Sequence, residues 1–265
     1  MKSSLVSQVP GLAARGQIGL RGDAFAHKAN PVPDYSPILS IFTAAFELAA
    51  CAWCMRAGGR RPILNNVALT LLLLAGYQLI EVAVCHAPHD PFWARLAFAD
   101  VVWLPPLGLV LLHRLAVPTR AVWGWLVRLS LAGAAFLSVW VFADPRFVTG
   151  TVCKTVIAIY LHPTNALEAY GAFYHLGLWS MIIAGIQLAR TATSAVDRAH
   201  AADFAMGTVA FVVLALTTAT VFPDSREATP SVMCHYAIVL AVFMVRIARR
   251  EHRSGTNIAA NPQKA

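Results

Sequence analysis

The sequence predicts an all-α membrane protein whose chain crosses the bilayer seven times. Apolar residues and cysteine make up 58% of its 265 residues, charged residues make up only 13%, and the mean hydropathy is +0.60. A soluble domain is about half apolar and about a quarter charged, so this chain has too few charged side chains to cover a water-exposed surface. Seven stretches of about 20 mostly apolar residues are long enough to cross the hydrocarbon core as helices.

Short joints rich in Gly, Pro, Asp and Arg separate the expected spans. The spans cover residues 37–56, 64–85, 92–112, 121–143, 169–189, 202–222 and 230–248. In the third span, Pro105 and Pro106 lack backbone donors, which predicts a kink. Residues 1–36 contain no continuous apolar run of the kind found in a signal peptide, and we expect a mobile tail there. A seven-helix domain over 37–250 and a cytoplasmic tail over 251–265 complete the expected organisation.

Residues 147–161 are the ambiguous stretch. They are apolar, but the run is only 15 residues long and contains Lys154 at its centre, which is short for a span. We therefore expect the segment 144–168 to form an outer-face loop or a re-entrant piece. An eighth span over the same residues is the alternative.

The distribution of Lys and Arg predicts the orientation, because short basic loops stay in the cytoplasm. Twelve basic residues belong to one set of joints and the C-terminal tail: Arg56, Arg60, Arg61, Arg114, Arg120, Arg190, Arg198, Arg246, Arg249, Arg250, Arg253 and Lys264. Eight belong to the opposite joints and the N-terminal tail: Arg95, Arg146, Lys154, Arg226, Lys2, Arg15, Arg21 and Lys28. The N-terminus is expected outside and the C-terminus inside, in a bacterial-type inner membrane. The net charge of +8 then indicates topology and attraction to anionic lipid headgroups, not nucleic-acid binding.

Polar residues within the expected spans are the candidates for function, since charged groups in hydrocarbon are costly unless paired or wetted. They are Glu47, Glu81, Asp100, Gln78, His175, Cys234 and His235. At 1.5 Å of rise per residue, most of them lie within roughly 6–12 Å of the outer end of their helices, and Glu47 lies at roughly 15 Å. A buried polar pocket in the outer third of the bundle, built around Glu81, Asp100, His175 and His235, would explain this. Three roles remain open for these groups: helix packing, binding of a small ligand or metal, and a proton or ion path.

The five cysteines suggest two kinds of chemistry. Cys51 and Cys54 lie one helical turn apart and are expected to pack. Cys85, Cys153 and Cys234 fall on the outer side, where a disulfide of Cys153 with Cys85 or with Cys234 can form. The pairs Cys85-His86 and Cys234-His235 are weak metal-ligand candidates, because neighbouring helical residues point in different directions.

Several cofactors can be tested against the sequence. Retinal needs a lysine within the bundle, and the four lysines (2, 28, 154 and 264) all lie outside the spans, so retinal is excluded. A metal ion remains possible, and so does a haem between His175 and His235. The His-x-x-x-His element of membrane hydrolases and nucleotide-binding fingerprints are absent from the spans.

Four motifs resemble a functionally uncharacterised family of bacterial multipass proteins that typically begin Met-Cys-Phe-Ser-Pro. They are Tyr35-Ser-Pro-Ile-Leu-Ser, Leu71-Leu-Leu-Leu-Ala-Gly-Tyr-Gln-Leu-Ile-Glu-Val, Trp103-Leu-Pro-Pro-Leu-Gly and Ser231-Val-Met-Cys-His-Tyr-Ala. Gln78 and Glu81 match that family's Gln-Leu-x-Glu element, and Cys234 matches its Ser-Val-Trp-Cys element. Asp34 and Met233 depart from the family's Cys and Trp. The resemblance implies a fold and a shared locale for Glu81 and Cys234, but no reaction.

The leading hypothesis is therefore a membrane protein that binds a small ligand, a metal or protons in a transporter-like or sensor-like role. Its expected partner is the lipid bilayer, and whether other membrane subunits join it is left open. A structural or assembly subunit of a larger membrane complex is the alternative, and a metal-dependent membrane enzyme is a further one.

Overall fold

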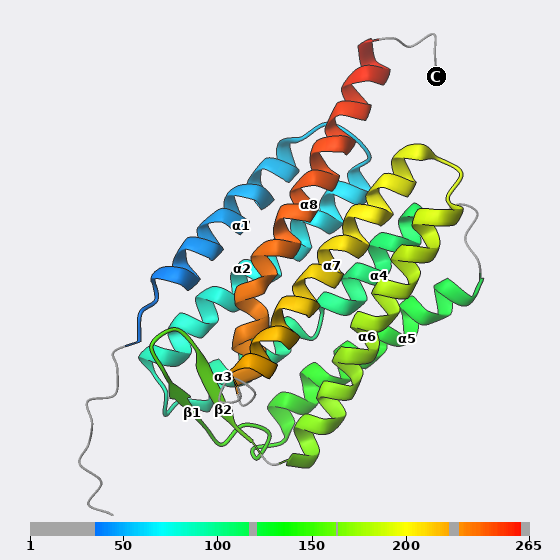
Figure 1. Ribbon diagram of the computed structural model, residues 1–265. Helices are drawn as coiled ribbons and strands as arrows, with labels where there is room; N and C mark the ends of the chain where they lie inside the picture. Colours follow the sequence, from blue (N-terminus) through cyan, green and yellow to red (C-terminus); the bar gives the residue numbers. More distant parts are fainter. Residues whose placement is uncertain (1–34, 117–120, 163, 223–227, 261–265) are drawn as a thin grey trace, which may run out of the picture. The chain divides into compact units, whose positions relative to one another are not determined.

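A computed structural model describes residues 35–116, 121–162, 164–222 and 228–260 (Figure 1). The elements in chain order are α1 (Ile38–Arg56), α2 (Arg61–His86), α3 (Pro91–Val101), α4 (Leu104–Leu115), α5 (Ala121–Ala143), β1 (Gly150–Cys153), β2 (Ala158–Leu161), α6 (Thr164–Thr191), α7 (Ala195–Val221) and α8 (Thr229–Ala260). Residues 1–34 of the expected N-terminal tail lie outside the described residues, and so do the basic residues Arg120, Arg226 and Lys264.

The all-α seven-helix prediction is confirmed. Within the described residues, seven helices are long and apolar enough to cross a membrane, with α3 and α4 together forming the third span, Pro91–Leu115. Successive spans run in opposite directions, so the loops gather at two ends of the bundle. We call these the hairpin end, which carries β1 and β2, and the Arg60 end, which carries the loop between α1 and α2.

The third span is broken where the sequence predicts a kink. Helix α3 ends at Val101, two residues form a turn, and α4 begins at Leu104 with Pro105 and Pro106 in its first turn. Proline suits the first turn of a helix, where a missing N–H leaves no bond unmade. The backbone N–H of Trp103 donates to the Asp100 carbonyl, which tightens the last turn of α3.

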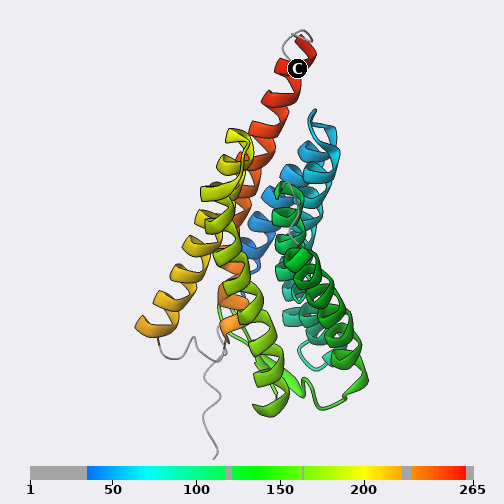
Figure 2. The same cartoon turned by 90° about the vertical axis from the view of Figure 1, so that its right-hand side faces the viewer.

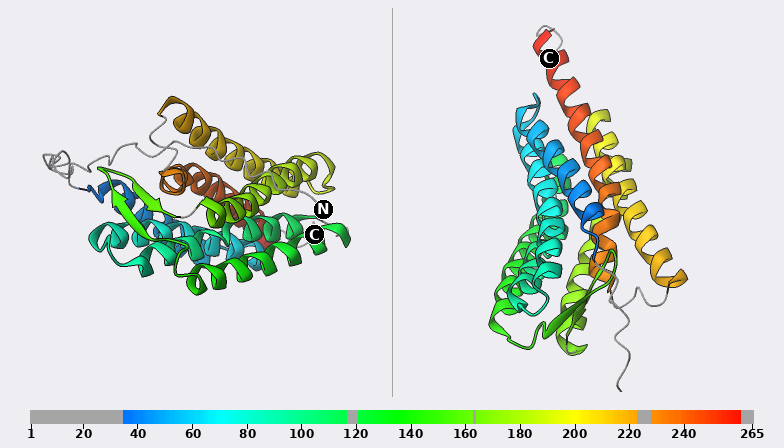
Figure 3. Two further views of the ribbon diagram at one scale, coloured as in Figure 1. Left: turned by 90° about the horizontal axis from the view of Figure 1, so that it is seen from below. Right: turned by 90° about the vertical axis from the view of Figure 1, so that its left-hand side faces the viewer.

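The helices form two groups around a central contact between α2 and α8. Figures 2 and 3 show α6, α7 and α8 on one side and α1 to α5 on the other. Helix α8 packs against α1, α2 and α7, and α4 joins the groups through its contact with α6. The side chains that face outward from the spans are mostly apolar, as expected for lipid contact, and examples are Phe42, Leu129, Phe136, Leu176 and Ile183.

Residues 147–161 form neither an eighth span nor a re-entrant helix. They form an antiparallel hairpin in which Gly150 pairs with Leu161 and Cys153 with Ala158. The run is rich in Thr, Val and Ile, whose branched side chains favour strands. The hairpin is also tied to the start of α1, because the Ser36 N–H donates to the Thr155 carbonyl at 2.8 Å.

Helix α8 continues to Ala260, well beyond the expected end of the last span at residue 248. Its extra turns pack on the loop between α1 and α2. A Cβ built on Gly255 would lie 2.9 Å from the Gly59 Cα, and Gly59 itself has a φ of +128°, which favours glycine. Part of the stretch expected as a cytoplasmic tail is therefore helix.

Two glycines allow α4 and α6 to approach each other closely. A Cβ on Gly177 of α6 would lie 2.5 Å from the Cβ of Pro105, and a Cβ on Gly108 of α4 would lie 2.5 Å from the Cε of Met181. Close backbone approach through small residues is how helices associate in a membrane, where no hydrophobic force drives them together. These contacts fix the position of α6 against the broken span.

We expect Gly177→Ala to destabilise the protein by about 1–3 kcal/mol, because the added methyl group overpacks against the rigid Pro105 ring. Gly171→Ala on the same helix is the matched control, since a Cβ there meets nothing within 4 Å. The thermal unfolding midpoint in detergent, followed by tryptophan fluorescence, should fall for the first variant only. Equal midpoints for the two variants would contradict the close contact.

Candidate functional site: a cavity and a buried polar network

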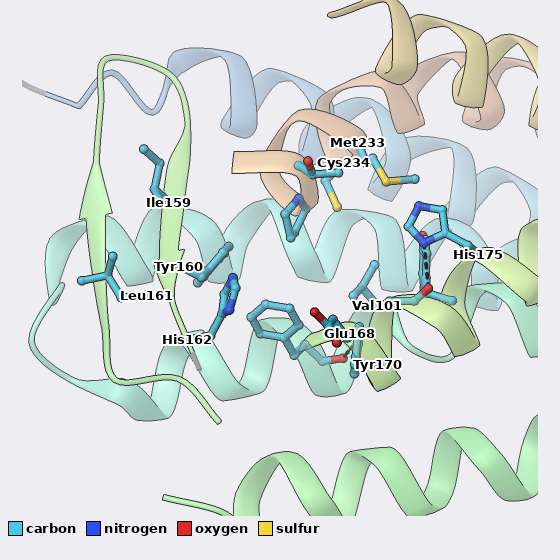
Figure 4. A pocket seen from close by; sticks show the side chains of 15 residues that line it. Val101, Ile159, Tyr160, Leu161, His162, Glu168, Tyr170, His175, Met233 and Cys234 are labelled. Carbon is cyan, nitrogen blue, oxygen red and sulfur yellow. Dashed lines mark hydrogen bonds between the residues drawn. The ribbon is translucent and has the colours of Figure 1, made fainter. Parts of the chain in front are cut away.

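A cavity of about 620 Å³ lies at the hairpin end, between α6, the first turns of α8 and strand β2 (Figure 4). Its lining is mostly aromatic and aliphatic: Phe98, Val101, Ile159, Tyr160, Leu161, His162, Glu168, Tyr170, Gly171, Tyr174, His175, Thr229, Pro230, Met233 and Cys234. Leu161, Glu168 and His175 are exposed, so the cavity opens to the surface. Sites for small molecules have this size and this largely apolar character.

Aromatic rings form the inner wall of the cavity. The ring of Phe98 packs edge-to-face against Tyr160 and Tyr170, with centroids 5.1 and 5.2 Å apart. The Tyr170 hydroxyl donates to the Phe98 carbonyl at 2.6 Å, and the hydroxyls of Tyr160 and Tyr77 lie 3.1 Å apart. Buried tyrosines with satisfied hydroxyls make a rigid wall, so this side of the cavity is preformed.

The polar groups of the cavity are few and lie near its mouth. His175 donates its Nδ1–H to the Gly171 carbonyl at 2.7 Å, which leaves Nε2 as an acceptor (Figure 4). The buried Nδ1 of His162 has no hydrogen-bond partner among the described residues. Together with the Glu168 carboxylate, these groups can orient the polar end of a bound molecule.

Glu81 lies at the centre of a separate polar network close to this cavity. Its side chain is fully buried; Oε1 lies 3.8 Å from His235 Nε2 and 3.5 Å from the hydroxyl of Tyr35. The same hydroxyl lies 3.2 Å from Ser40 Oγ. Burial is the main cause that raises the pKa of Tyr35 to about 12, and the charge of Glu81 adds to it, so Tyr35 stays a donor.

The four residues at the centre of the predicted pocket do not form one cluster. Glu81 and His235 are together, whereas His175 faces the cavity from the exposed side of α6. Asp100 lies against α2 at Gly76, where an added Cβ would sit 3.2 Å from Oδ1. Among the described residues, neither Asp100 nor His175 contacts Glu81 by a hydrogen bond or ion pair.

Gln78 and Cys234 connect α2 to α8 below this network. Gln78 donates its Nε2–H to the Cys234 carbonyl at 2.7 Å. The Cys234 side chain is buried and borders the cavity.

Glu47 is the most isolated of the acids. Its side chain is fully buried on α1, and neither carboxylate oxygen has a hydrogen-bond partner among the described residues. The hydroxyl of Thr43, one turn before it, is likewise buried without a partner. An isolated polar pair of this kind in the interior of a bundle is costly and calls for a functional explanation.

The disulfide joins Cys85 to Cys153, one of the two pairings that the sequence left open. The two Cα atoms are 5.7 Å apart, and the bond ties the hairpin to the end of α2. Cys51, Cys54 and Cys234 are free and buried. Within the described part of the chain no group of three or more His, Cys, Asp or Glu side chains could hold a metal ion. Cys85 is occupied by the disulfide, and His86 is exposed with its Nδ1 bonded to Val82.

Sequence reasoning missed an ionic cluster at the Arg60 end. The Arg60 guanidinium lies 2.7 Å from Asp197 and 2.9 Å from Glu251, and the Arg60 backbone N–H also donates to Glu251. His200, fully buried, has its two ring nitrogens 4.0 Å from Asp197 and 3.8 Å from Glu251. The hydrogen bonds that the Arg60 guanidinium donates, chiefly to Glu251 and also to Asp197, raise the pKa of Arg60 above its usual range.

A signal for this cluster was present in the sequence. Glu251 is the only acid in the basic run from Arg246 to Arg253, and Ser194-x-x-Asp197 is a helix-start pattern. A second group of ion pairs lies close by in the sequence. The Asp203 carboxylate pairs with Arg246 at 3.1 Å and with Arg250 at 3.2 Å. Several arginines that the sequence assigns to topology therefore also hold α2, α7 and α8 together.

No family model matches the chain, and no curated protein matches it either. The resemblance to the bacterial multipass family rests on its four motifs alone.

Replacing Arg60 by Ala should destabilise the protein by about 3 kcal/mol, because it leaves the Asp197 and Glu251 carboxylates buried without their cation. Arg61→Ala is the control, since Arg61 is exposed and bonds only to the Met55 carbonyl among the described residues. Chemical unfolding of both variants in detergent would measure the difference. If they unfold alike, the cluster does not stabilise the bundle.

Proposed function

We propose that this protein binds a small, largely apolar molecule in the cavity at the hairpin end, in a sensor-like or transporter-like role. The observation that carries the proposal is the cavity of about 620 Å³ with a preformed aromatic wall and polar groups only near its mouth. An apolar lining with a few placed polar groups is typical of small-molecule sites. His162, Glu168 and His175 suit a ligand with one polar or basic end and an apolar body.

The arrangement of the mouth supports entry of the ligand from the membrane or its surface. His175 and Gly171 belong to a span, whereas Leu161 and His162 belong to the end of the hairpin. An apolar molecule partitions into the bilayer, where its local concentration is high. The cavity therefore faces the phase in which such a ligand accumulates.

We also infer that the hairpin end lies outside a bacterial-type inner membrane and the C-terminus inside. Two independent observations support this orientation. Most arginines of the described loops lie at the Arg60 end, as expected for cytoplasmic loops. The disulfide of Cys85 and Cys153 lies at the opposite end, and disulfides persist in oxidising compartments such as the periplasm.

Gly171→Leu is expected to block the cavity without disturbing the fold, because a side chain there enters open space. Ala172→Leu adds the same side chain to the exposed neighbour outside the cavity. Small molecules that copurify with each protein can be extracted and measured by mass spectrometry. A ligand retained by the wild type and by Ala172→Leu, but depleted at least about tenfold in Gly171→Leu, is the expected result. The same molecules in all three samples would contradict the site.

The orientation can be tested on spheroplasts with a membrane-impermeant maleimide. After treatment with a membrane-impermeant phosphine reductant, we expect labelling of Cys85 and Cys153, because their disulfide opens on the outer side. The double variant Cys85→Ser/Cys153→Ser controls for the buried Cys51, Cys54 and Cys234. Labelling only after the membrane is broken would reverse the orientation.

A further inference from the structure

The buried polar groups around Glu81 have too few hydrogen-bond donors. Three acceptor atoms of this region are buried without a partner among the described residues: Glu81 Oε2, Gln78 Oε1 and His235 Nε2. Gln78 and Glu81 lie one turn apart on one face of α2, and Gln78 donates to the carbonyl of Cys234, the residue before His235 on α8. A buried acceptor that has no donor costs free energy. Three of them in one region favour a positively charged group between α2 and α8.

The hydrogen bond of its ring fixes the tautomer of His235. The Nδ1 atom lies 2.7 Å from the Ser231 carbonyl oxygen, which can only accept, so Nδ1 carries a proton. The neutral ring then presents the lone pair of Nε2 to Glu81 Oε1, which is 3.8 Å away. This distance is too long for a hydrogen bond. Two electron-rich atoms therefore face each other in the interior of the bundle.

Two hydroxyl groups lie beside this pair. The Tyr35 hydroxyl is 3.5 Å from Glu81 Oε1 and 3.2 Å from Ser40 Oγ. A hydroxyl has lone pairs besides its proton, so it can bind a cation while it donates a hydrogen bond. One carboxylate, two hydroxyls and one imidazole nitrogen are thus brought together by α2, by α8 and by the start of α1 with the residue in front of it.

The spacing of these atoms indicates the size of the cation that they suit. The measured separations are 3.2, 3.5 and 3.8 Å. For ligands at right angles around an ion, they correspond to ion–ligand distances of about 2.3–2.7 Å, close to the range in which oxygen binds Ca²⁺. Mg²⁺, which holds its ligands at about 2.0–2.1 Å, is too small. Na⁺ has nearly the same radius as Ca²⁺ and also fits, whereas K⁺ is larger.

The charge of the site distinguishes Na⁺ from Ca²⁺. Glu81 is the only acid among the four side chains, and Tyr35 keeps its proton at neutral pH. One carboxylate balances one positive charge, whereas Ca²⁺ would leave an excess charge in the hydrocarbon region, which is costly. The set also lacks the three or more His, Cys, Asp or Glu ligands that are typical of zinc, as does the rest of the described chain.

We propose that Glu81, His235, Tyr35 and Ser40 form a binding site for a sodium ion between α1, α2 and α8. The Glu81 carboxylate supplies the balancing charge, and the two hydroxyls and the imidazole nitrogen are neutral ligands. Tyr35 is half-buried and precedes the first span, so the ion reaches the site from the hairpin end.

The sodium site is separate from the ligand cavity, because none of its four side chains lines that cavity. It therefore stands or falls independently of the proposed ligand. A bound ion also joins the start of α1 to α2 and α8, next to the hydrogen bond between Ser36 and Thr155 that ties α1 to the hairpin. Sodium is therefore expected to stabilise the bundle at this end.

Thermal unfolding of the full-length protein in detergent tests the site. Sodium chloride, potassium chloride and choline chloride are compared at pH 8 and equal ionic strength. We expect sodium alone to raise the midpoint of the wild type, by at least about 4 °C at saturation, because it binds the folded state only. Equal midpoints in the three salts would overturn the proposal. Stabilisation by calcium chloride without stabilisation by sodium chloride would overturn it as well.

Three variants locate the ion. Glu81→Gln removes the charge with little change in shape and should abolish the sodium shift, and Ser40→Ala should raise the half-saturating sodium concentration by at least about tenfold. Asp100→Asn is the matched control, because Asp100 is an acid within a span but outside the ligand set, and it should respond to sodium as the wild type does. A sodium shift that persists in Glu81→Gln would place the ion elsewhere and contradict the site.

Equilibrium binding of radioactive sodium to the purified wild type needs no variant to fold. We expect about one ion bound per chain, displaced by unlabelled sodium but not by potassium at the same concentration. If Glu81 and His235 share only a proton, the protein retains no radioactive sodium, and the proposal is wrong.

Discussion

The interior of a bilayer contains no water, so each polar group on these helices must find a partner inside the bundle or give up its charge. The structure meets this constraint differently at its two ends. At the Arg60 end, Asp197 and Glu251 are paired with an arginine and can stay charged. Toward the hairpin end, Glu81 shares one histidine and Glu47 has no partner among the described residues. The acids are therefore paired with a permanent cation at one end of the bundle and lack one toward the other.

Much of the fold follows from the sequence because membrane thickness and hydropathy limit the possibilities. The seven spans were predictable on this basis, and the break before Pro105 was predictable from the missing backbone donors of Pro105 and Pro106. The hairpin was not, since a 15-residue apolar run with one lysine is compatible with several structures until its strands pair. The long α8 was missed for a different reason: its last turns are too polar for lipid, and Gly59 stabilises them through a tertiary contact.

The sequence predicts how deep the candidate residues lie along their helices, but not which way their side chains point. Helical rise places Glu81, Asp100, His175 and His235 at similar levels, yet the rotation of each helix decides which of them meet. Glu81 and His235 point toward each other, Asp100 points toward Gly76 of α2, and His175 turns to the cavity. Hydropathy carries little information on rotation in a lipid-embedded helix, because one face contacts acyl chains and the other contacts equally apolar neighbours.

The attachments of the hairpin have a consequence for how the cavity changes shape. Strand β2 forms one of its walls, and the hairpin is anchored to α2 through Cys85 and to the start of α1 through Ser36. That wall is consequently stationary with respect to the first two spans. The α8 wall is held to α2 by the hydrogen bond from Gln78 to the Cys234 carbonyl and to the hairpin by the bond from the Ala158 N–H to Ser231, so a larger ligand would be admitted by a displacement of α6 about its close contact with Pro105 at Gly177. Gly177 lies less than two helical turns from Gly171, which lines the cavity. A small tilt of α6 would therefore be enough to change the width of the cavity opening.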